Sequence, residues 1–408
     1  MAPLRCLSVA LFLLPLACGG ARSPDAEGGG TVSGSVLDDQ GNPMLGHFNV
    51  LLSGQVQMTG PDGSFSFSDV PPTYDITVAW GNGAMVYQGM TTRSPVFHFA
   101  QDTNAAKVSV QLPAPVDDTH HVAFFATSAQ GKTTQVGVYG AGGPNTVTFV
   151  YFVDGAVAPP VTLHALTYET DPATKMLTKW TGHAELDSVY LNAPLPTWVV
   201  QPSPVETGTI GVAVDVPSGI TLEKMTLALH FEPANARFPL TEVSTSTPST
   251  QFTVPIVPGL SFDALAEGTT SDGHTTTWAR NVTAGTTVAL GLNEPPHIIG
   301  PDDGATEANT QTAFTFTPDD RGVQMVTFYP PQSDPNYFSI QMVTSRGAVT
   351  IPDFTLLGHP LPKGEVYTWN VARLPLGKSV DAASSAPILD DSVAFDAESS
   401  QRQFTTAH

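Results

Sequence analysis

Cysteine is nearly missing from this 408-residue chain, in which Cys6 and Cys18 are the only two and both lie close to the N-terminus. Residues 19–408 therefore contain no thiol that could form a disulfide, bind zinc or act as a nucleophile. With 41% hydrophobic residues the chain has enough apolar side chains for folded cores. Its domains must therefore be stabilised by apolar packing.

Basic residues are also scarce, with 16 Lys and Arg against 37 Asp and Glu and a net charge of −21. Binding to nucleic acid depends on clustered Lys and Arg, so this balance excludes nucleic acid as a partner and disfavours anionic lipid surfaces. An acidic surface commonly serves solubility. Binding of divalent cations by the acidic groups stays open as an alternative.

A long apolar run is absent too. After Arg5, residues 7–16 are apolar except for Ser8 and Pro15, which is too short for the roughly 20 residues of a membrane-spanning helix. A positive charge followed by a short apolar run is typical of a signal peptide. We therefore expect residues 1–17 to be a signal peptide.

The run ends in the sequence Pro-Leu-Ala-Cys-Gly-Gly at positions 15–20, which resembles the bacterial lipoprotein box. The resemblance implies that Cys18 is diacylated and becomes the N-terminus, and that the Gly-rich residues 18–30 form a flexible tether. Position 19 is Gly and not Asp, so the family rule implies an outer-membrane lipoprotein. Pro15 departs from the usual aliphatic residue, and the alternative is a plain secretory signal that leaves Cys18 unused.

The rest of the chain has almost no helical periodicity. Short alternating runs rich in Val, Thr, Phe and Tyr are separated by proline-bearing joints near residues 113–115, 194–204 and 295–296. This pattern predicts an all-β protein of tandem antiparallel β-sandwich domains, Ig-like or prealbumin-like, joined by Pro-rich linkers. The predicted domains are residues 31–112, 116–193, 205–293 and 294–408, and the short joints predict a semi-rigid rod.

The first unit has the most specific motifs. They are Gly34-x-Val36, a turn at 38–43, Gly60-Pro61-Asp62-Gly63, Phe65-x-Phe67, Val70-Pro71 and Tyr74-x-Ile76-x-Val78. Their order resembles the carboxypeptidase regulatory-like domain. The resemblance implies a transthyretin-like sandwich of seven strands, closed by residues 107–112, that serves secreted proteins as an accessory module without catalysis.

The second and third units share a pattern that suggests an internal repeat. Leu163-His164-Ala165-Leu166 precedes Trp180, and Phe262-Asp263-Ala264-Leu265 precedes Trp278, with Ala-to-Trp spacings of 15 and 14 residues. Residues 74–77 of the first unit occupy the same place after a double proline. We therefore expect three related sandwiches in tandem.

The fourth unit contains Ala313-Phe314-Thr315-Phe316 and Tyr367-Thr368-Trp369. These features resemble a fibronectin type III or other Ig-like module, which implies that Tyr367 and Trp369 pack between its two sheets. Residues 378–400 are rich in Ser, Ala and Asp and are expected to form an exposed loop.

Catalytic motifs are missing. The chain has no Gly-x-Ser-x-Gly, no His-Glu-x-x-His, no phosphate-binding Gly-rich loop and no regular calcium loop, so we predict no enzyme, no catalytic residue, no cofactor and no metal site. Residues 117–121, Asp-Asp-Thr-His-His, form the densest group of ligand-type side chains. Neighbours on an extended segment point to opposite faces, so we interpret this group as a solvated linker.

Other polar groups have similarly ordinary interpretations. His183 and Glu185 lie two apart on a predicted strand face and are expected to be surface contacts. The acidic pairs at 302–303, 319–320 and 390–391 fall in predicted turns, where Asp is favoured. Among the tryptophans, 80, 180, 278 and 369 are expected in cores, and Trp198, in a Pro-rich joint, is expected to wedge two domains together.

These observations favour a non-enzymatic, lipid-anchored protein of the cell envelope. Its sandwiches would act as a spacer that presents a binding surface to a glycan or another envelope protein. A polysaccharide-binding accessory module with exposed Trp or Tyr rings is the alternative. A hydrolase built from two carboxylates of different modules is a remote alternative. The sequence identifies neither the ligand nor the oligomeric state.

Overall fold

The computed structural model describes residues 29–38, 41–44, 48–99, 103–112, 117–128, 133–134, 138–139, 146–152, 160–174, 176–191, 197–231, 236–244, 246–257, 260–331, 338–375, 377–386 and 396–408. The expected signal peptide, the expected lipidation site Cys18, the proline joint at 113–115 and the acidic pair at 390–391 lie outside these residues. No helix among the described residues is long and apolar enough to cross a membrane.

Nearly all regular structure in the described chain is β-strand, as the sequence predicts. The helical elements are the short helix α1 (Val380–Ser384) and the 3-10 turn η1 (Thr355–Leu357). The strands form four sandwiches, each made of a three-stranded sheet that faces strands of a second sheet. The all-β, multi-sandwich fold class is confirmed.

The first sandwich pairs strand order β4-β1-β7 with β3-β2-β5-β6. A tight turn at Gly60–Gly63 leads into β4, where a Cβ on Gly63 would come within 2.3 Å of the Val36 carbonyl oxygen. Glycine is therefore required there. The strands are β1 (Gly30–Asp38), β2 (Asn49–Leu52), β3 (Gln55–Met58), β4 (Ser64–Val70), β5 (Tyr74–Trp80), β6 (Gly83–Met90) and β7 (Val96–Phe99).

The second sandwich pairs β12-β8-β15 with β10-β9-β13-β14, and β11 also pairs with β9. Its core contains Val108, Val110, Phe124 and Leu163. The strands are β8 (Thr103–Gln111), β9 (His120–Ser128), β10 (Thr133–Thr134), β11 (Val138–Tyr139), β12 (Thr146–Phe152), β13 (Val161–Thr170), β14 (Leu177–Val189) and β15 (Trp198–Val199).

The third sandwich pairs β19-β16-β22 with β18-β17-β20-β21. The strands are β16 (Thr207–Asp215), β17 (Thr221–Phe231), β18 (Ala236–Ser244), β19 (Ser249–Pro255), β20 (Phe262–Thr269), β21 (Gly273–Val282) and β22 (Thr287–Gly291).

These three sandwiches share one topology. The first strand of each (β1, β8, β16) lies in the middle of a three-stranded sheet, antiparallel to one neighbour and parallel to the last strand of the unit. The repeated segments at 74–77, 163–166 and 262–265 all lie on the corresponding strands β5, β13 and β20. The prediction of three related sandwiches is confirmed.

Two sequence predictions at the first and second joints were wrong. Residues 107–112 do not close the first unit, because β8 pairs with β12 and β15 and opens the second sandwich. The position beside β1 is already occupied by β7, whose Phe97 pairs with Val36. Trp198 does not wedge two domains together: it is buried in the second core, with its ring edge against Phe124 at 5.7 Å.

The fourth sandwich pairs β23-β25-β28 with the strands around β26 and β29. Tyr367 and Trp369 lie between its sheets as predicted, and Trp369 meets Phe314 edge-to-face at 5.0 Å. The strands are β23 (Ile298–Gly300), β24 (Ala305–Ala308), β25 (Phe314–Phe316), β26 (Val323–Tyr329), β27 (Ser339–Thr344), β28 (Ala348–Val349), β29 (Val366–Leu374), β30 (Ala397–Ser399) and β31 (Arg402–Thr406).

The expected exposed loop at 378–400 is only partly a loop. It contains α1, whose Val380 and Ala383 are buried, and β30, which pairs with both β29 and β21. Ser379 begins the helix by accepting a hydrogen bond from the backbone of Ala382, so a local capping signal was present in this segment.

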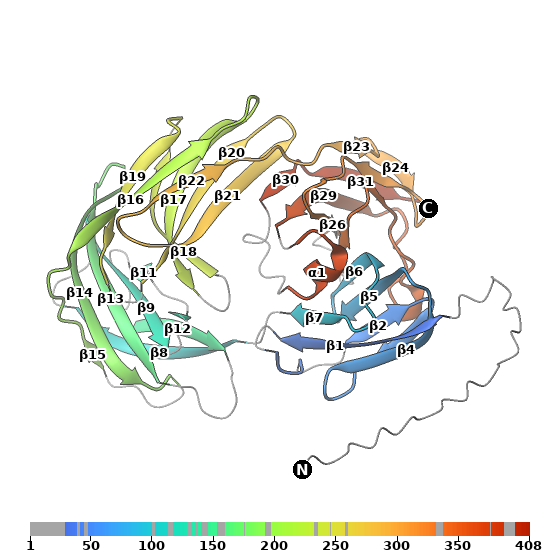
Figure 1. The fold of residues 1–408 in the computed structure, drawn as a ribbon, viewed down its shortest axis with the longest axis horizontal. Coiled ribbons are helices and arrows are strands. Elements are labelled where there is room, and N and C mark those ends of the chain that lie inside the picture. Colours follow the sequence, from blue (N-terminus) through green and yellow to red (C-terminus); the bar gives the residue numbers. More distant parts are fainter. Residues whose placement is uncertain are drawn as a thin grey trace, which may run out of the picture.

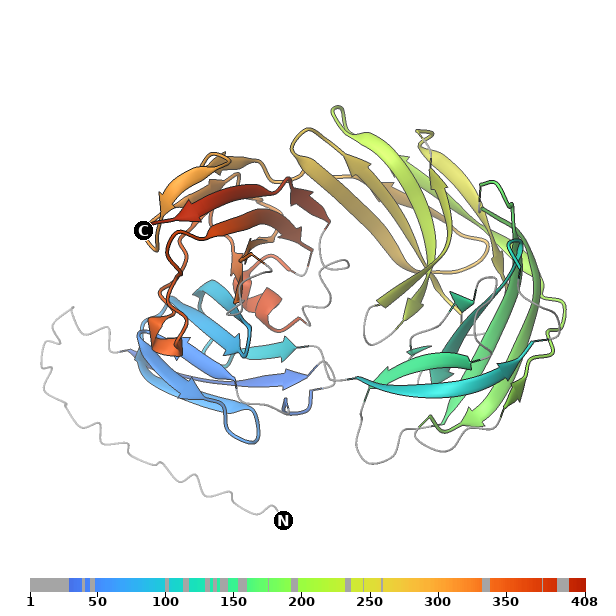
Figure 2. The same cartoon turned by 180° about the vertical axis from the view of Figure 1, so that it is seen from behind.

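The chain is not a rod, which corrects the sequence prediction. Strand β6 of the first unit pairs in parallel with β27 of the fourth, from Gly83 opposite Ser339 to Tyr87 opposite Val343, and the four units close on themselves (Figures 1 and 2). Residues 83–87 of β6 are apolar and buried on both faces, and Ile340, Met342 and Val343 of β27 are buried beside them, which is typical of strands inside a sheet. Leaving these edges unpaired would expose backbone groups and apolar side chains together.

Apolar cores cross the unit boundaries as well. Val343 and Leu374 of the fourth unit lie in the first unit's core, while Phe125 and Trp180 of the second unit lie in the third unit's core. The β6–β27 and β21–β30 pairings join the first, third and fourth units in one 14-stranded sheet. Among the described residues, the prolines at 202, 204, 295 and 296 therefore lie between packed units and do not act as spacers.

Candidate functional site

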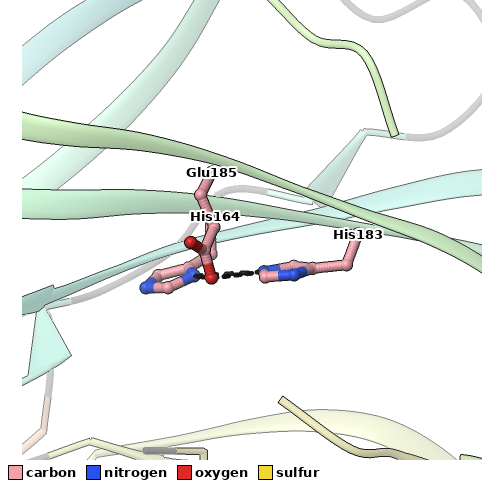
Figure 3. A group of neighbouring side chains, drawn as sticks. All are labelled: His164, His183 and Glu185. Atoms are coloured by element: carbon pink, nitrogen blue, oxygen red, sulfur yellow. Dashed lines mark hydrogen bonds and ion pairs between the residues drawn. The ribbon is translucent and has the colours of Figure 1, made fainter. Parts of the chain in front are cut away.

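Three ligand-type side chains converge on the second sandwich, on the sheet face directed away from its own core. His164 lies on β13, and His183 and Glu185 lie on β14, where the strand register places Glu185 opposite His164. His164 Nδ1 is 3.1 Å from His183 Nε2, and Glu185 Oε1 is 3.6 Å from each of these nitrogens. Figure 3 shows the carboxylate beside the facing edges of both rings.

The surroundings hold the two rings in place. The His164 side chain is only 5% exposed, its ring stacks on Phe125 at 4.7 Å, and its Nε2 is 2.8 Å from Thr127 Oγ1. The backbone of His183 exchanges hydrogen bonds of 2.8 and 2.9 Å with Ser203 in the segment that leads to the third unit. The site is thus closed around His164 and opens at Glu185, whose side chain is 45% exposed.

Both imidazoles are neutral at pH 7. Burial, together with charge repulsion from the neighbouring His183, lowers the pKa of His164 to about 4. Burial also lowers the pKa of His183, although Glu185 opposes this effect. Each neutral ring carries a nitrogen with a free lone pair, so the two rings can act as hydrogen-bond acceptors or as ligands.

The sequence prediction for this cluster was incomplete. His183 and Glu185 do share one strand face, as expected, but they are joined by His164 from the neighbouring strand. In the sequence, His164 stands out only as part of the repeated segment at 163–166. Its proximity depends on the β13–β14 register, which is set by pairing between segments that are separate in the sequence.

The acidic and histidine-rich segment at 117–121 forms a turn that leads into β9. Asp117 accepts hydrogen bonds from the Thr119 side chain and backbone and from His120, and these bonds lower its pKa. His121 turns elsewhere, with Nε2 2.9 Å from Thr170 Oγ1 and its ring on Tyr168. The two histidines do not share a site.

A second feature is a polar cleft of about 500 Å³ between the third and fourth units. Asp272 and His297 approach to 3.1 Å across it, and Arg321 pairs with Asp319 at 3.0 Å. None of its lining residues is a Trp, Tyr or Phe. The cleft can therefore take hydrogen-bonding groups but offers no aromatic ring face.

Acidic pairs have structural roles where they are described. Asp303 accepts a hydrogen bond of 2.7 Å from the backbone of Gln403. Asp319 and Asp396 both pair with the buried guanidinium of Arg373. Because the carboxylates of Asp319 and Asp396 are neutralised by this shared cation, they do not form the opposed pair that a glycosidase uses.

The tryptophans divide into two groups. Trp180 and Trp369 are buried, as predicted, whereas Trp80 and Trp278 are partly exposed. Trp278 is covered in part by Arg280, whose guanidinium carbon is 5.6 Å from the ring centroid. Among the large hydrophobic side chains that are well exposed in the described chain, Tyr190 is the aromatic one.

No protein-family model matches this chain, and no curated protein matches it. Many solved structures show weak similarity, among them the following three. The Bacillus anthracis TIE protein is 12% identical over 65% of this chain and 51% of its own, with a TM-score of 0.18. The pilus adhesin SpaC from Lactobacillus rhamnosus GG is 10% identical over 64% of this chain and 43% of its own, with a TM-score of 0.15.

The N-terminal four Ig domains of Dscam1 are 10% identical over 93% of this chain and 99% of that structure, with a TM-score of 0.17. The chain spans about half the length of the TIE structure. TM-scores this low support no conclusion about how the domains are arranged or what the chain does. The assignment of the sandwich fold therefore depends on the strand pairing described above.

Proposed function

We propose that this chain is a non-enzymatic, lipid-anchored protein of the cell envelope, in which four linked sandwiches form a scaffold that presents a binding surface to a glycan or another envelope protein. The observation that carries the proposal is the arrangement of the chain: a lipoprotein-type signal and tether lead directly into β1 of a closed assembly of sandwiches. The family rule for position 19 supports an outer-membrane address.

The cores shared between units support a scaffold that holds its surface in one arrangement. Packing of the first unit with the fourth, and of the second with the third, removes the hinges that separate domains would have. The lack of catalytic motifs in the sequence, together with the neutralisation of Asp319 and Asp396 by Arg373, favours binding over catalysis.

The polar cleft between the third and fourth units is the best candidate for the binding surface. Its Asp272, His297 and Arg321 side chains are partly exposed and offer both donors and acceptors. A glycan bound there would be held by hydrogen bonds. Stacking on rings has less support, because an aromatic-lined pocket in the fourth unit is formed by Phe338, Phe354 and Tyr367, whose rings are buried.

The anchor is tested by fractionation of cells that produce the wild-type chain, Cys18→Ser or Cys6→Ser. Cys6→Ser is the matched control, since Cys6 lies in the segment expected to be removed. We expect the wild type and Cys6→Ser in the membrane fraction, released by detergent and not by salt, and Cys18→Ser in the soluble fraction. Membrane retention of Cys18→Ser would contradict the anchor.

The binding surface is tested with soluble residues 19–408 in pull-downs on insoluble envelope and extracellular polysaccharides, with and without calcium. Saturable retention that is weakened by Asp272→Ala would assign glycan binding to the cleft. A specific envelope protein retained in the same way would assign a scaffold role instead. A chain that retains neither class of partner would refute the proposed function.

A further inference from the structure

We propose that His164, His183 and Glu185 form a binding site for one zinc-class divalent transition-metal ion, bound through His164 Nδ1, His183 Nε2 and Glu185 Oε1. The site is independent of the scaffold function proposed above. Its basis is the geometry of three side chains from two neighbouring strands, whose ligand atoms form one compact group.

The three atoms form a triangle with sides of 3.1, 3.6 and 3.6 Å. The point equidistant from them lies about 2.0 Å from each, which matches zinc–imidazole and zinc–carboxylate bonds of about 2.0–2.2 Å. Donor atoms around tetrahedral zinc are separated by about 3.3 Å, close to the observed sides. An ion therefore fits after a tilt of the two imidazole rings, without movement of either strand.

The ring orientations bring the two nitrogens face to face beside Glu185. The planes of His164 and His183 are only 12° apart, with centroids separated by 5.4 Å, and the rings meet at the edges that carry the two nitrogens (Figure 3). At a nitrogen–nitrogen distance of 3.1 Å, this centroid separation means that the two nitrogens point almost directly at each other, so a shared ion requires both rings to tilt toward Glu185. Thr127 Oγ1 beside His164 Nε2 supplies the outer hydrogen bond that metal-binding histidines usually have.

The metal-free alternative is a single hydrogen bond between the two imidazoles. It accounts for the 3.1 Å distance but not for the carboxylate, because Glu185 Oε1 lies 3.6 Å from both nitrogens, beyond an ordinary hydrogen bond. One ion at the centre explains all three positions together. Asp187, close enough to influence His164 electrostatically, adds negative charge that favours a cation.

The donor set selects the type of ion. Two imidazoles and one carboxylate suit zinc and neighbouring transition metals, whereas calcium and magnesium prefer oxygen ligands. Three protein ligands leave a fourth position, and the exposure of Glu185 places that position on the solvent side. The expected site is therefore an open three-ligand centre, able to hold water or a group from a partner.

Isothermal titration of residues 19–408 with Zn²⁺ tests the proposal, with Co²⁺ as a spectroscopic probe and Ca²⁺ and Mg²⁺ as negative probes. We expect one Zn²⁺ per chain and the intense visible absorption of tetrahedral Co²⁺. His183→Gln and Glu185→Gln should each weaken binding at least tenfold. His120→Gln is the matched control, because it removes an exposed histidine of the same unit that lies outside the cluster.

Glu185→Gln keeps the size of an exposed side chain, so loss of binding in this variant is not attributable to unfolding, and circular dichroism checks the fold of all three variants. Absence of stoichiometric Zn²⁺ binding would overturn the proposal. So would affinity that is unchanged in His183→Gln and Glu185→Gln, or that falls equally in His120→Gln.

Discussion

The pairing of the first unit with the fourth predicts that removing a few buried side-chain atoms from one unit will lower the stability of the other. Val343 on β27 is fully buried, pairs with Tyr87 of β6 and contributes to the first unit's core. Val343→Ala removes two buried methyl groups, each worth about 0.8 kcal/mol, and leaves a small cavity. We expect the packed pair of the first and fourth units to lose about 2 kcal/mol of unfolding free energy.

Native-state hydrogen exchange measures this effect strand by strand. Where exchange reports the opening equilibrium, a loss of about 2 kcal/mol accelerates exchange about 30-fold for amides exposed by that opening. We expect the acceleration in β5 and β6 of the first unit as well as in β26 and β29 of the fourth. These strands pack on the same cores although they are far apart in the sequence.

Val212→Ala is the matched control, because it deletes the same atoms from a buried valine of β16 in the core shared by the second and third units. It should accelerate exchange in β17 and β20 and leave β5 unchanged. Faster exchange in β26 and β29 with unchanged β5 and β6 after Val343→Ala would show that the first and fourth units open separately, and would refute the closed arrangement.

Two further predictions concern contacts between units. Trp180→Phe removes the 2.8 Å hydrogen bond from Trp180 Nε1 to the Thr253 carbonyl, and we expect a loss of about 1–2 kcal/mol in urea denaturation followed by circular dichroism; an unchanged midpoint would show that the contact contributes nothing. Partial burial of Asp381 raises the pKa of its carboxyl group. Hydrogen bonds from Thr91 and Thr92 outweigh this effect, so the net pKa is lowered. Its stabilising effect is therefore complete above pH 4 and is lost as the pH falls through the lowered pKa. Asp381→Asn should be about 1–2 kcal/mol less stable at pH 7, with the difference shrinking below pH 4; a pH-independent difference would refute this account.

The local features of the fold could be predicted because they depend on nearby residues. Alternating valines at 32 and 36 place side chains on one face of β1, and both are buried. The repeated segments could be aligned by eye because strands at equivalent positions carry similar side chains. Residues 107–112 could be recognised as a strand for the same reason. They could not be assigned to a sandwich, because the assignment depends on which distant strand has a free edge.

The closure and the histidine cluster depend on pairing between distant segments. One signal for the closure was present: residues 83–87 are apolar at consecutive positions, which is typical of a strand buried on both faces and not of an edge. His164 and Glu185 carried no comparable signal. A strand can pair in several registers, and a shift of one residue would place His164 on the opposite face of its sheet.

The closed arrangement changes what the tether can do. In a rod, the fourth unit would lie farthest from the membrane. Here β1, which follows the proposed tether, is in the pair formed by the first and fourth units, while the second and third units lie at the other end of the longest axis (Figure 1). An anchor at Cys18 would hold the first and fourth units near the membrane. The second sandwich, with His164, His183 and Glu185, would then be the part carried farthest from the point of attachment, where a partner could reach its open carboxylate side.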